Sequence, residues 1–404
     1  MAVANYDSPF RSFWWGGYEC TDQLNAFGNR VDFLPLTGHL QLIDQDYTDL
    51  GQFNIRTVRE GIRWAMIEKT PYQYDWSTVQ QMLDAGQRAG IQQVWDLCHF
   101  GYPDDLTPLH PMFARRFAAL CRAFVHFYRA QRPDETLIVT PINEVSFMSW
   151  LGGDARGTSP YCVGQGWEVK YGLMRAYIEG SWAMREIDPG IRFLSTEPLI
   201  SIIPPPNPWE SHRREAKRMH KDQFQAIDIL SGRMCPELGG HESLLDIIGF
   251  NFYYDNQWHL HPHRRIGWND TPVDPRWVPL SELLRQAHQR YKRPFVVTET
   301  SHPGVDRPLW WDMIGRECVK ALGLGLPLQG VCLYPIIDRP DWDHLNHWHQ
   351  SGLWDAGLRP DGPPHRHLHE PSAVALLQAQ TAVAQAQADR AKPKRSRAPQ
   401  LVLQ

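Results

Sequence analysis

The sequence predicts an α/β protein folded as a single (β/α)8 barrel. Two observations carry this prediction: eight short strand-like runs, and the helical segments that separate them. The 404 residues are 42% hydrophobic, so the chain can bury a large core, either in one domain or in two. The regular alternation of strand and helix favours one closed barrel, because parallel strands with helical crossovers bury both faces of the sheet.

The eight runs are short, and several are apolar throughout rather than alternating, as expected for buried parallel strands. They lie at residues 12–19, 53–60, 91–100, 136–144, 191–198, 244–254, 294–301 and 330–338. Helical spacing follows in DWSTVQQMLDAGQRAG, MFARRFAALCRAFVHFYRA and GWEVKYGLMRAYIEGSWAMREIDPG. A doubly wound open sheet is the rival fold. No GxGxxG or GxxxxGK[ST] loop follows an early strand, which weighs lightly against it.

The barrel is expected to span residues 1–371. Beyond it, the Ala- and Gln-rich segment 372–391 predicts an outer helix, and the basic, proline-broken segment 392–404 predicts a disordered tail. The stretch PPPNPWESHRREAKRMHKDQ, after the fifth run, predicts an inserted rim loop and helix.

Composition narrows the possible partners and the compartment. The 41 basic and 45 acidic residues give a net charge of −4, which favours neither nucleic acid nor an anionic membrane. No signal peptide or membrane span is visible, and seven cysteines without a CxxC pair predict reduced, buried thiols in the cytoplasm. The 17 Trp suit either stacking on sugars or a large core, and Trp14, Trp15 and Trp64 are predicted to belong to the core. Oligomeric state stays open.

Polar side chains stand at the carboxyl ends of the predicted strands, which is where the chemistry of such barrels is found. They are Arg59, His99, Asn143, Glu144, Tyr253, Glu299, Tyr334 and Asp338. Glu144 and Glu299 end the fourth and seventh strands, so they should face each other across the barrel mouth. Cleavage of a glycosidic bond needs two such carboxyl groups, about 5 to 5.5 Å apart for retention and roughly 6.5 to 9.5 Å apart for inversion of configuration.

The motifs resemble those of glycoside hydrolase family 1, the β-glucosidase type of retaining (β/α)8 enzyme. TPINEV is similar to the family's acid/base motif T-x-N-E-P, and VVTETS is similar to its nucleophile motif T-E-N-G. Further likeness, from about Phe13 to Trp354, lies in WGGYECTDQ, REGIRW, HFGYPDDL, DIIGFNFYY and YPIIDRPDWD.

The resemblance implies a role for each matching residue. Glu144 would be the acid/base, Glu299 the nucleophile, and Asn143 the ligand of the sugar's 2-hydroxyl. Arg59 and Tyr253 would flank the nucleophile, with Tyr253 also near the substrate. The remaining glycone-binding positions would be Gln23, His99, Tyr334, Asp341 and Trp342. Neither a metal nor another cofactor is expected, and the implied partner is a small-molecule carbohydrate.

The chain also departs from the family pattern. Phe100 replaces a Trp, Val145 a Pro, and Thr300-Ser301 an Asn-Gly pair. Tyr334 stands where a Trp floors the sugar, and Asp341 stands where a Glu grips its outer hydroxyls. These last two changes leave the identity of the glycone open.

Several alternatives stay open at this stage. One is a simple ion pair of Arg59 with Glu19 or Glu60, and Glu197, at the end of the fifth run, is given a secondary place. The histidines of DWDHLNHWHQ invite a metal site, which their spacing disfavours. A carbohydrate-binding pseudoenzyme, or a transglycosylase using the same two glutamates, competes with a hydrolase.

Overall fold

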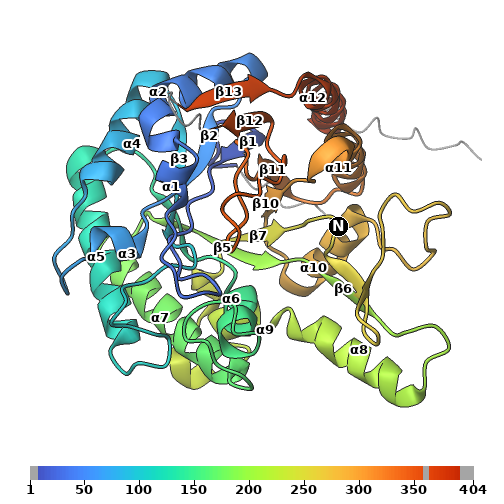
Figure 1. Cartoon of the computed structure of the whole chain (residues 1–404), viewed down its shortest axis with the longest axis horizontal. Coiled ribbons are helices and arrows are strands. Elements are labelled where there is room, and N and C mark those ends of the chain that lie inside the picture. The colour runs from blue at the N-terminus through green and yellow to red at the C-terminus, as the bar shows by residue number, and fades with distance from the viewer. Residues whose placement is uncertain (1–7, 358–363, 392–404) are drawn as a thin grey trace, which may run out of the picture.

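Eight parallel strands close into a barrel surrounded by helices, as the sequence predicts (Figure 1). The computed structural model describes residues 8–357 and 364–391. The order around the barrel is β1-β11-β10-β7-β5-β4-β3-β2. The strands are β1 (Trp14–Gly17), β2 (Thr57–Gly61), β3 (Gln92–Cys98), β4 (Ile138–Ile142), β5 (Arg192–Pro198), β7 (Ile247–Asn251), β10 (Phe295–Thr300) and β11 (Leu328–Leu333).

Each predicted run overlaps one barrel strand, and among the predicted starts that of the second run differs most. The run was expected to begin at Phe53, whereas Leu50–Phe53 form the 3-10 helix η1 and β2 begins at Thr57. Asn54 ends η1 with a φ of 50°, a left-handed conformation that asparagine tolerates better than most residues. The chain therefore turns before it can enter the sheet.

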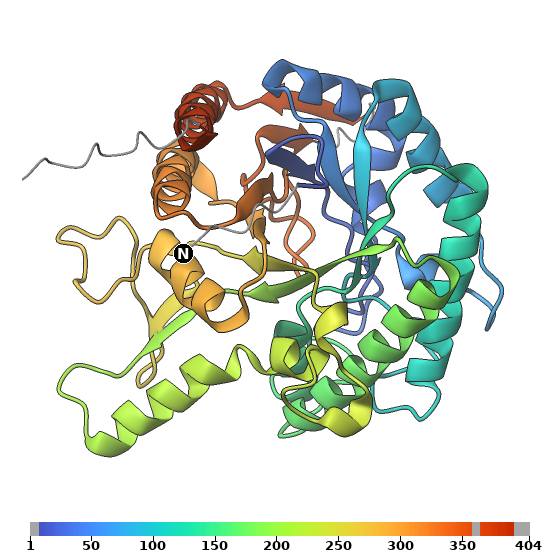
Figure 2. The ribbon, with the colours of Figure 1, turned by 180° about the vertical axis from the view of Figure 1, so that it is seen from behind.

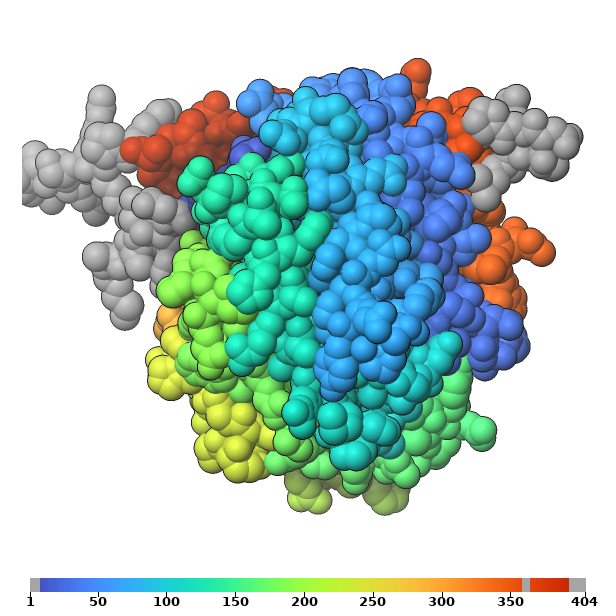
Figure 3. Space-filling model, turned by 90° about the vertical axis from the view of Figure 1, so that its left-hand side faces the viewer, coloured from blue at the N-terminus to red at the C-terminus, as the bar shows by residue number. Residues whose placement is uncertain are grey.

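A ring of helices covers the outside of the barrel. Its main members are α2 (His39–Asp49), α4 (Ser77–Ala89), α5 (Phe113–Gln131), α7 (Gly166–Ile187), α9 (Gln225–Leu230), α10 (Leu280–Tyr291), α11 (Arg307–Gly323) and α12 (Glu370–Ala391). Figure 3 shows the N-terminal half of this wall, where neighbouring helices lie side by side. At the contact of α5 with α7, a Cβ on Gly180 would lie 2.8 Å from the Cys121 sulfur, so glycine permits the close packing.

The apolar core of the barrel and its helices has two parts. One large cluster fills the layer between the barrel and the helices, and it contains Trp14 and Trp64. A second, smaller cluster fills the barrel interior below the mouth with side chains from seven of the eight strands: Trp15, Val94, Ile138, Leu194, Ile247, Val296, Cys332 and Tyr334. The three tryptophans predicted to be core are therefore buried, and the barrel is a packed core that supports its rim.

Two smaller sheets lie outside the barrel. The segment predicted as a rim loop and helix, residues 204–223, contains α8 (Glu210–Asp222). It directly follows β6 (Ser201–Ile203), which joins β8 (Gln257–His259) and β9 (Arg264–Arg265) in a sheet that the sequence does not reveal. Figures 1 and 2 show α8 standing away from the barrel on this side.

Near the C-terminus, β12 (Trp354–Gly357) and β13 (His365–Leu368) pair antiparallel and lead into α12. This helix packs on α11, where a Cβ on Gly315 would lie 2.6 Å from the Ala379 Cβ. A helix was expected over 372–391, and the tail predicted at 392–404 lies outside the described residues.

The remaining helices of the described residues, apart from α8 and η1, are short. They are α1 (Phe33–Leu36), α3 (Trp64–Ile67), α6 (Val145–Gly153), η2 (Pro236–Leu238), η3 (Glu242–Leu244) and η4 (Gly304–Asp306). Among the described helices, none combines the length and the apolar character that crossing a bilayer requires. All seven cysteines are free thiols, with Cys98 and Cys332 buried in β3 and β11.

Candidate active site

Arg59 is the centre of a hydrogen-bond network at the carboxyl ends of the strands. The side chain is fully buried on β2 and makes two contacts with Asp96, Nε to Oδ1 at 3.0 Å and Nη2 to Oδ2 at 2.7 Å. Its Nη1 donates to Glu299 Oε1 at 2.6 Å, and its Nη2 donates to Asn143 Oδ1 at 2.7 Å. One guanidinium thus joins residues from β3, β10 and the end of β4.

The simpler expectation for Arg59, pairing with Glu19 or Glu60, is wrong. Glu60 points to the other face of β2, where its Oε1 accepts from Tyr47 and contacts His39. Glu19 pairs with Arg339 at 3.1 Å. Successive strand side chains point to opposite faces, so Arg59 and Glu60 cannot share a site.

Glu299 ends β10 with a donor on each carboxylate oxygen. Tyr253 donates its hydroxyl to Oε2 at 2.8 Å, and Arg59 serves Oε1. The register of β10 against β7 shifts between Val297 and Glu299, and such an irregularity re-aims the side chain that follows it. Each carboxylate oxygen thus has its own hydrogen-bond donor, and one of the two donors is a cation.

Glu144 lies between β4 and α6, and its backbone has a φ of 46° in the left-handed region. Its N–H donates to Thr196 O at 3.1 Å, and its Oε1 accepts from Asn251 Nδ2 at 2.9 Å. Burial, followed by the negative charge of Glu299, raises the pKa of Glu144 well above its ordinary value. This shift favours the protonated form of the carboxyl group, which is the form that a general acid needs.

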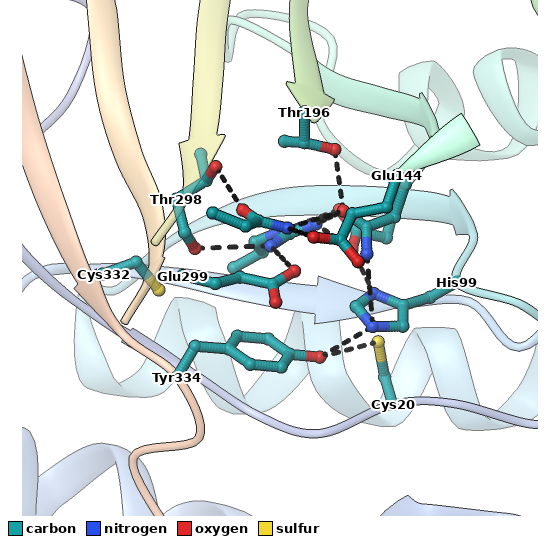
Figure 4. Close-up of polar contacts among 12 residues, drawn as sticks. Cys20, His99, Glu144, Thr196, Thr298, Glu299, Cys332 and Tyr334 are labelled. Atoms are coloured by element: carbon teal, nitrogen blue, oxygen red, sulfur yellow. Dashed lines mark hydrogen bonds and ion pairs between the residues drawn. The ribbon is translucent and has the colours of Figure 1, made fainter. Parts of the chain in front are cut away.

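The two carboxyl groups are connected through a chain of hydrogen bonds. Asn251 Nδ2 donates to Glu144 Oε1 at 2.9 Å and to Asn143 Oδ1 at 3.4 Å, and Asn143 Oδ1 also accepts from the Arg59 guanidinium that donates to Glu299. Asn251 also accepts at Oδ1 from the Thr298 hydroxyl at 2.7 Å. Figure 4 shows Glu144 and Glu299 next to each other, with the Tyr334 ring beneath them. Glu144 is 8% exposed and Glu299 is 4% exposed, so both residues are buried.

Asn143 and His99 line the same mouth. Asn143 Oδ1 accepts from Arg59 and from the Thr196 hydroxyl, both at 2.7 Å. His99 Nδ1 lies 2.8 Å from Asp96 Oδ2, and its Nε2 lies 3.2 Å from the Tyr334 hydroxyl. Burial opposes the charged imidazole, but the bond to Asp96 outweighs it and raises the pKa of His99.

Tyr334 forms the floor at the position where a tryptophan was expected from the family pattern. Its ring covers Gly17, where an added Cβ would lie 2.2 Å from Tyr334 Cδ2. The Arg59 guanidinium lies 5.3 Å from the ring centroid, and the hydroxyl lies 3.8 Å from the Cys20 sulfur. The smaller ring is thus fixed against the barrel wall.

Gln23 and Trp342 have unsatisfied polar atoms. Gln23 Oε1 and Trp342 Nε1 are buried, and neither has a hydrogen-bond partner among the described residues. A buried polar atom without a partner is costly, so each atom would gain a hydrogen bond from a ligand hydroxyl that reached it. Both residues are among those predicted to bind the glycone.

Asp341 is placed differently from the other predicted residues. Its Oδ1 accepts from the backbone N–H groups of Asp343 and His344, each at 2.9 Å, and its Oδ2 lies 3.4 Å from His349 Nε2. The carboxylate therefore serves its own loop, and its contact with a glycone stays a prediction. Asp338, also named at a strand end, accepts from Ser351 N–H in the same region.

Sequence reasoning missed four residues of the network: Asp96, Thr196, Asn251 and Thr298. Asn251 lies inside the quoted motif DIIGFNFYY, so the motif could have identified it. Asp96 lies two residues after Val94, which points into the barrel, and strand alternation gives both the same face. The missing information was which face of each apolar run points inward.

One group of side chains in the mouth resembles a metal site in composition. The ligand atoms of Cys20, Asp96 and His99 lie within 4.8 Å of one another. Asp96 already pairs with the buried Arg59 guanidinium, and burial raises the pKa of the Cys20 thiol well above its ordinary value. A cysteine binds a metal as the thiolate, which the raised pKa of Cys20 disfavours. A divalent cation would also be repelled by the buried guanidinium beside Asp96. These residues therefore do not fit a metal.

Comparison with known proteins finds likeness only in structure. No family model and no curated protein sequence matches the chain. The family 1 β-glucosidase of Thermotoga maritima aligns over 95% of this chain and 99% of its own, with a TM-score of 0.72 and 13% identity. This chain has the family 1 β-glucosidase fold.

Two further solved structures agree with this finding. The Thermotoga maritima β-glucosidase in complex with glucoimidazole aligns over 94% of this chain and 99% of its own, with a TM-score of 0.71 and 12% identity. The virulence factor SghA, in complex with its substrate analogue salicin, aligns over 92% of this chain and 95% of its own, with a TM-score of 0.69 and 15% identity. At such identities the likeness concerns the fold.

Proposed function

We propose that the protein is a retaining β-glycosidase that releases the terminal β-linked sugar of a small glycoside or oligosaccharide. The observation that carries this proposal is the opposite environment of two neighbouring carboxyl groups. Glu299 has a cation and a hydroxyl as donors, whereas Glu144 has an amide donor and a raised pKa. Two carboxyl groups kept in opposite protonation states are what glycoside hydrolysis requires.

The reaction takes two steps. Glu299 attacks the anomeric carbon while Glu144 gives its proton to the departing oxygen, which forms a covalent glycosyl-enzyme and releases the alcohol. The ester bond removes the charge of Glu299, and with it one cause of the raised pKa of Glu144. Glu144 can then accept a proton from water, which attacks the anomeric carbon and frees Glu299.

The structural likeness supports a carbohydrate ligand. Among the similar solved structures are β-glucosidase complexes with glucoimidazole and with castanospermine. In this chain, the partnerless atoms of Gln23 and Trp342 and the ring of Tyr334 would meet the glycone. A cytoplasmic location stays a prediction from the sequence.

A panel of aryl β-glycosides tests the proposal. Wild-type protein should release the aryl alcohol from at least one of the glucoside, galactoside, fucoside and xyloside, and Glu299→Ala should abolish this. Added azide should partly restore the variant and give the α-glycosyl azide, because a small anion can occupy the space of the lost carboxylate. Saturable sugar binding without turnover by the wild type would favour the pseudoenzyme alternative instead.

The same panel separates hydrolysis from transglycosylation. An added alcohol acceptor competes with water for the glycosyl-enzyme, so the ratio of transfer product to free sugar measures which reaction dominates.

Activity should also decline as the pH rises through the pKa of Glu144, because the deprotonated carboxyl group cannot protonate the leaving oxygen. A kcat/KM that neither depends on the leaving group nor falls at alkaline pH would contradict an acid role for Glu144.

A further inference from the structure

Another buried carboxyl group, that of Glu197, lies directly behind the acid/base. Glu197 follows Thr196 on β5, and the Thr196 hydroxyl points into the mouth, where it donates to Asn143. Because strand side chains alternate, Glu197 points out of the barrel toward the helices. It is 3% exposed, and the catalytic cycle described above does not use it.

Glu197 holds the start of α6. Its two carboxylate oxygens lie 3.3 Å and 3.2 Å from the Ser146 N–H, in the first turn of a helix that begins at Val145. The first N–H groups of a helix have no partner within the helix, and the helix dipole favours a negative charge beside them. Glu144 occupies the N-cap position but makes no side-chain cap, so Glu197 takes over this function from another strand.

Two consecutive residues of β5 therefore hold the backbone on both sides of the Glu144 side chain. The Thr196 carbonyl accepts from the Glu144 N–H at 3.1 Å, and the Glu197 carboxylate accepts from Ser146 two residues later. Between these two contacts the backbone of Glu144 keeps its φ of 46°. A residue in this unfavourable region persists only where its surroundings fix it.

We propose, on the basis of the glycosidase function proposed above, that Glu197 is a positioning residue that fixes the backbone carrying the acid/base. Its contacts hold α6 against β5, and they thereby hold the Glu144 carboxyl group within reach of the glycosidic oxygen that it protonates. Glu197 does not touch the substrate, and its effect passes through the backbone of residues 144–146.

The electrostatics of the surroundings agree with this role. Burial raises the pKa of Glu197 to about 7, against the opposing effects of Ser146 and of the Lys170 ammonium on α7. Lys170 Nζ itself donates to Gln225 on α9 at 2.8 Å. The charge of Glu197 also contributes to the raised pKa of Glu144, after burial and Glu299. Burial, and after it the charge of Glu197, raise the pKa of Tyr177 on α7.

The test uses two substrates that differ in their need for an acid. A dinitrophenyl β-glycoside carries a leaving group that departs without protonation, whereas an alkyl β-glycoside needs the proton of Glu144. We expect Glu197→Ala to lower kcat/KM for the alkyl glycoside at least about tenfold, since a positioned general acid contributes roughly 10² to 10⁴ in rate. For the dinitrophenyl glycoside, kcat/KM should change little.

Glu317 offers a matched control. It is a buried carboxylate on α11 that accepts from the Ser281 N–H at 2.9 Å, in the first turn of α10, away from the mouth. Glu317→Ala should destabilise the protein, measured by its melting temperature, without a difference between the two substrates. Glu197→Gln keeps an acceptor oxygen and loses the charge, so it should restore most of the alkyl activity and move the alkaline limb to lower pH.

The outcomes separate this proposal from the function on which it rests. Wild-type turnover of neither substrate would reject the glycosidase proposal. Turnover of both by the wild type, with Glu197→Ala affecting the two substrates equally or no more than Glu317→Ala does, would reject the positioning role alone. A selective loss on the alkyl glycoside, with partial recovery in Glu197→Gln, would establish it.

Discussion

The two faces of β2 carry two buried polar networks that differ in how completely their charges are paired. On the inner face, Arg59 joins Asp96 and Glu299 at the barrel mouth. On the outer face, the neighbouring Glu60 joins a network between the barrel and α2. Burial of charge is common to both faces, so burial alone does not identify a functional site.

The outer network pairs its charges. His39 Nδ1 lies 2.7 Å from Asp46 Oδ2, and its Nε2 lies 3.0 Å from Glu60 Oε1. Arg366 makes two contacts with Asp46, at 2.7 and 2.9 Å. Although burial opposes it, the charge of Glu60 and the bond to Asp46 raise the pKa of His39 to about 9. Two cations thus face two carboxylates, as in an ion cluster that joins structural elements.

The inner network contains a carboxyl group that this pairing leaves out. Among the described residues, the hydrogen-bond partner of the Glu144 carboxyl group is an amide, and no cation pairs with it. Nearby, Gln23 and Trp342 keep polar atoms without partners. The outer network also has atoms without a partner among the described residues, Glu60 Oε2 and the Tyr18 hydroxyl. The comparison therefore teaches that a buried carboxyl group without a cation, rather than the number of charges or of partnerless atoms, distinguishes the inner network.

The largest effect is expected from breaking the inner network at its centre. Arg59→Met should lower the free energy of unfolding by about 3–5 kcal/mol, because Asp96 loses its buried cation. It should also lower kcat/KM by roughly 10² to 10³, because Glu299 loses its main electrostatic support. Denaturant unfolding and glycoside kinetics measure the two effects. A variant with unchanged kinetics would show that Arg59 is only structural.

His39→Phe breaks the outer network in the same way and keeps an aromatic ring stacked on Tyr18, whose centroid lies 3.7 Å from that of His39. The loss of unfolding free energy should again be about 3–5 kcal/mol. The kcat/KM of the folded protein should stay within about a factor of two, since distant sites behave independently. A large loss of activity would mean that the two faces of β2 are coupled.

Alkaline pH provides a reversible form of the same perturbation. The pKa of His39 is about 9 in the folded protein and about 6.5 in an unfolded chain, so its contribution is fully present below pH 6.5 and is lost as the pH rises through 9. The contribution is on the order of 3 kcal/mol. The difference in unfolding free energy between wild type and His39→Phe should shrink over this range. A constant difference would contradict a charged His39.

The smallest effect tests the partnerless atoms of the mouth. Trp342→Phe removes the Nε1 donor and keeps a ring near Phe100, whose centroid lies 5.5 Å from that of Trp342. We expect kcat/KM to fall by a factor that corresponds to about 1–2 kcal/mol of lost transition-state binding. The melting temperature should stay unchanged, because no internal hydrogen bond is lost. A lower melting temperature with unaltered kinetics would assign the indole to packing.

The sequence predicted the barrel because the apolar runs and the helical spacing are local features. Glu144, Glu299, Arg59 and Tyr253 were found for the same reason, since each stands at the end of a run, and the structure brings all four into one mouth. Whether these residues catalyse a reaction is a question for the experiments above.

Other features depend on contacts between distant segments. Asp96 looks like an ordinary strand residue until the register with β2 places it opposite Gly61 and beside Arg59. The pairing of β6 with β8 joins residues more than fifty positions apart, and no local sequence pattern predicts it. Glu197 has a secondary place in the sequence analysis because only the Asn143-Glu144 step matches an acid/base pattern, and the sequence does not show in which direction the Glu197 side chain points.

The left-handed backbone of Glu144 has a consequence for the stability of the chain. Holding a side chain in this region costs roughly 1–2 kcal/mol, a penalty that glycine would escape. Glycine at this position would release the strain, but it would also remove the carboxyl group. The chain therefore bears a folding cost at the residue that supplies a carboxyl group to the barrel mouth.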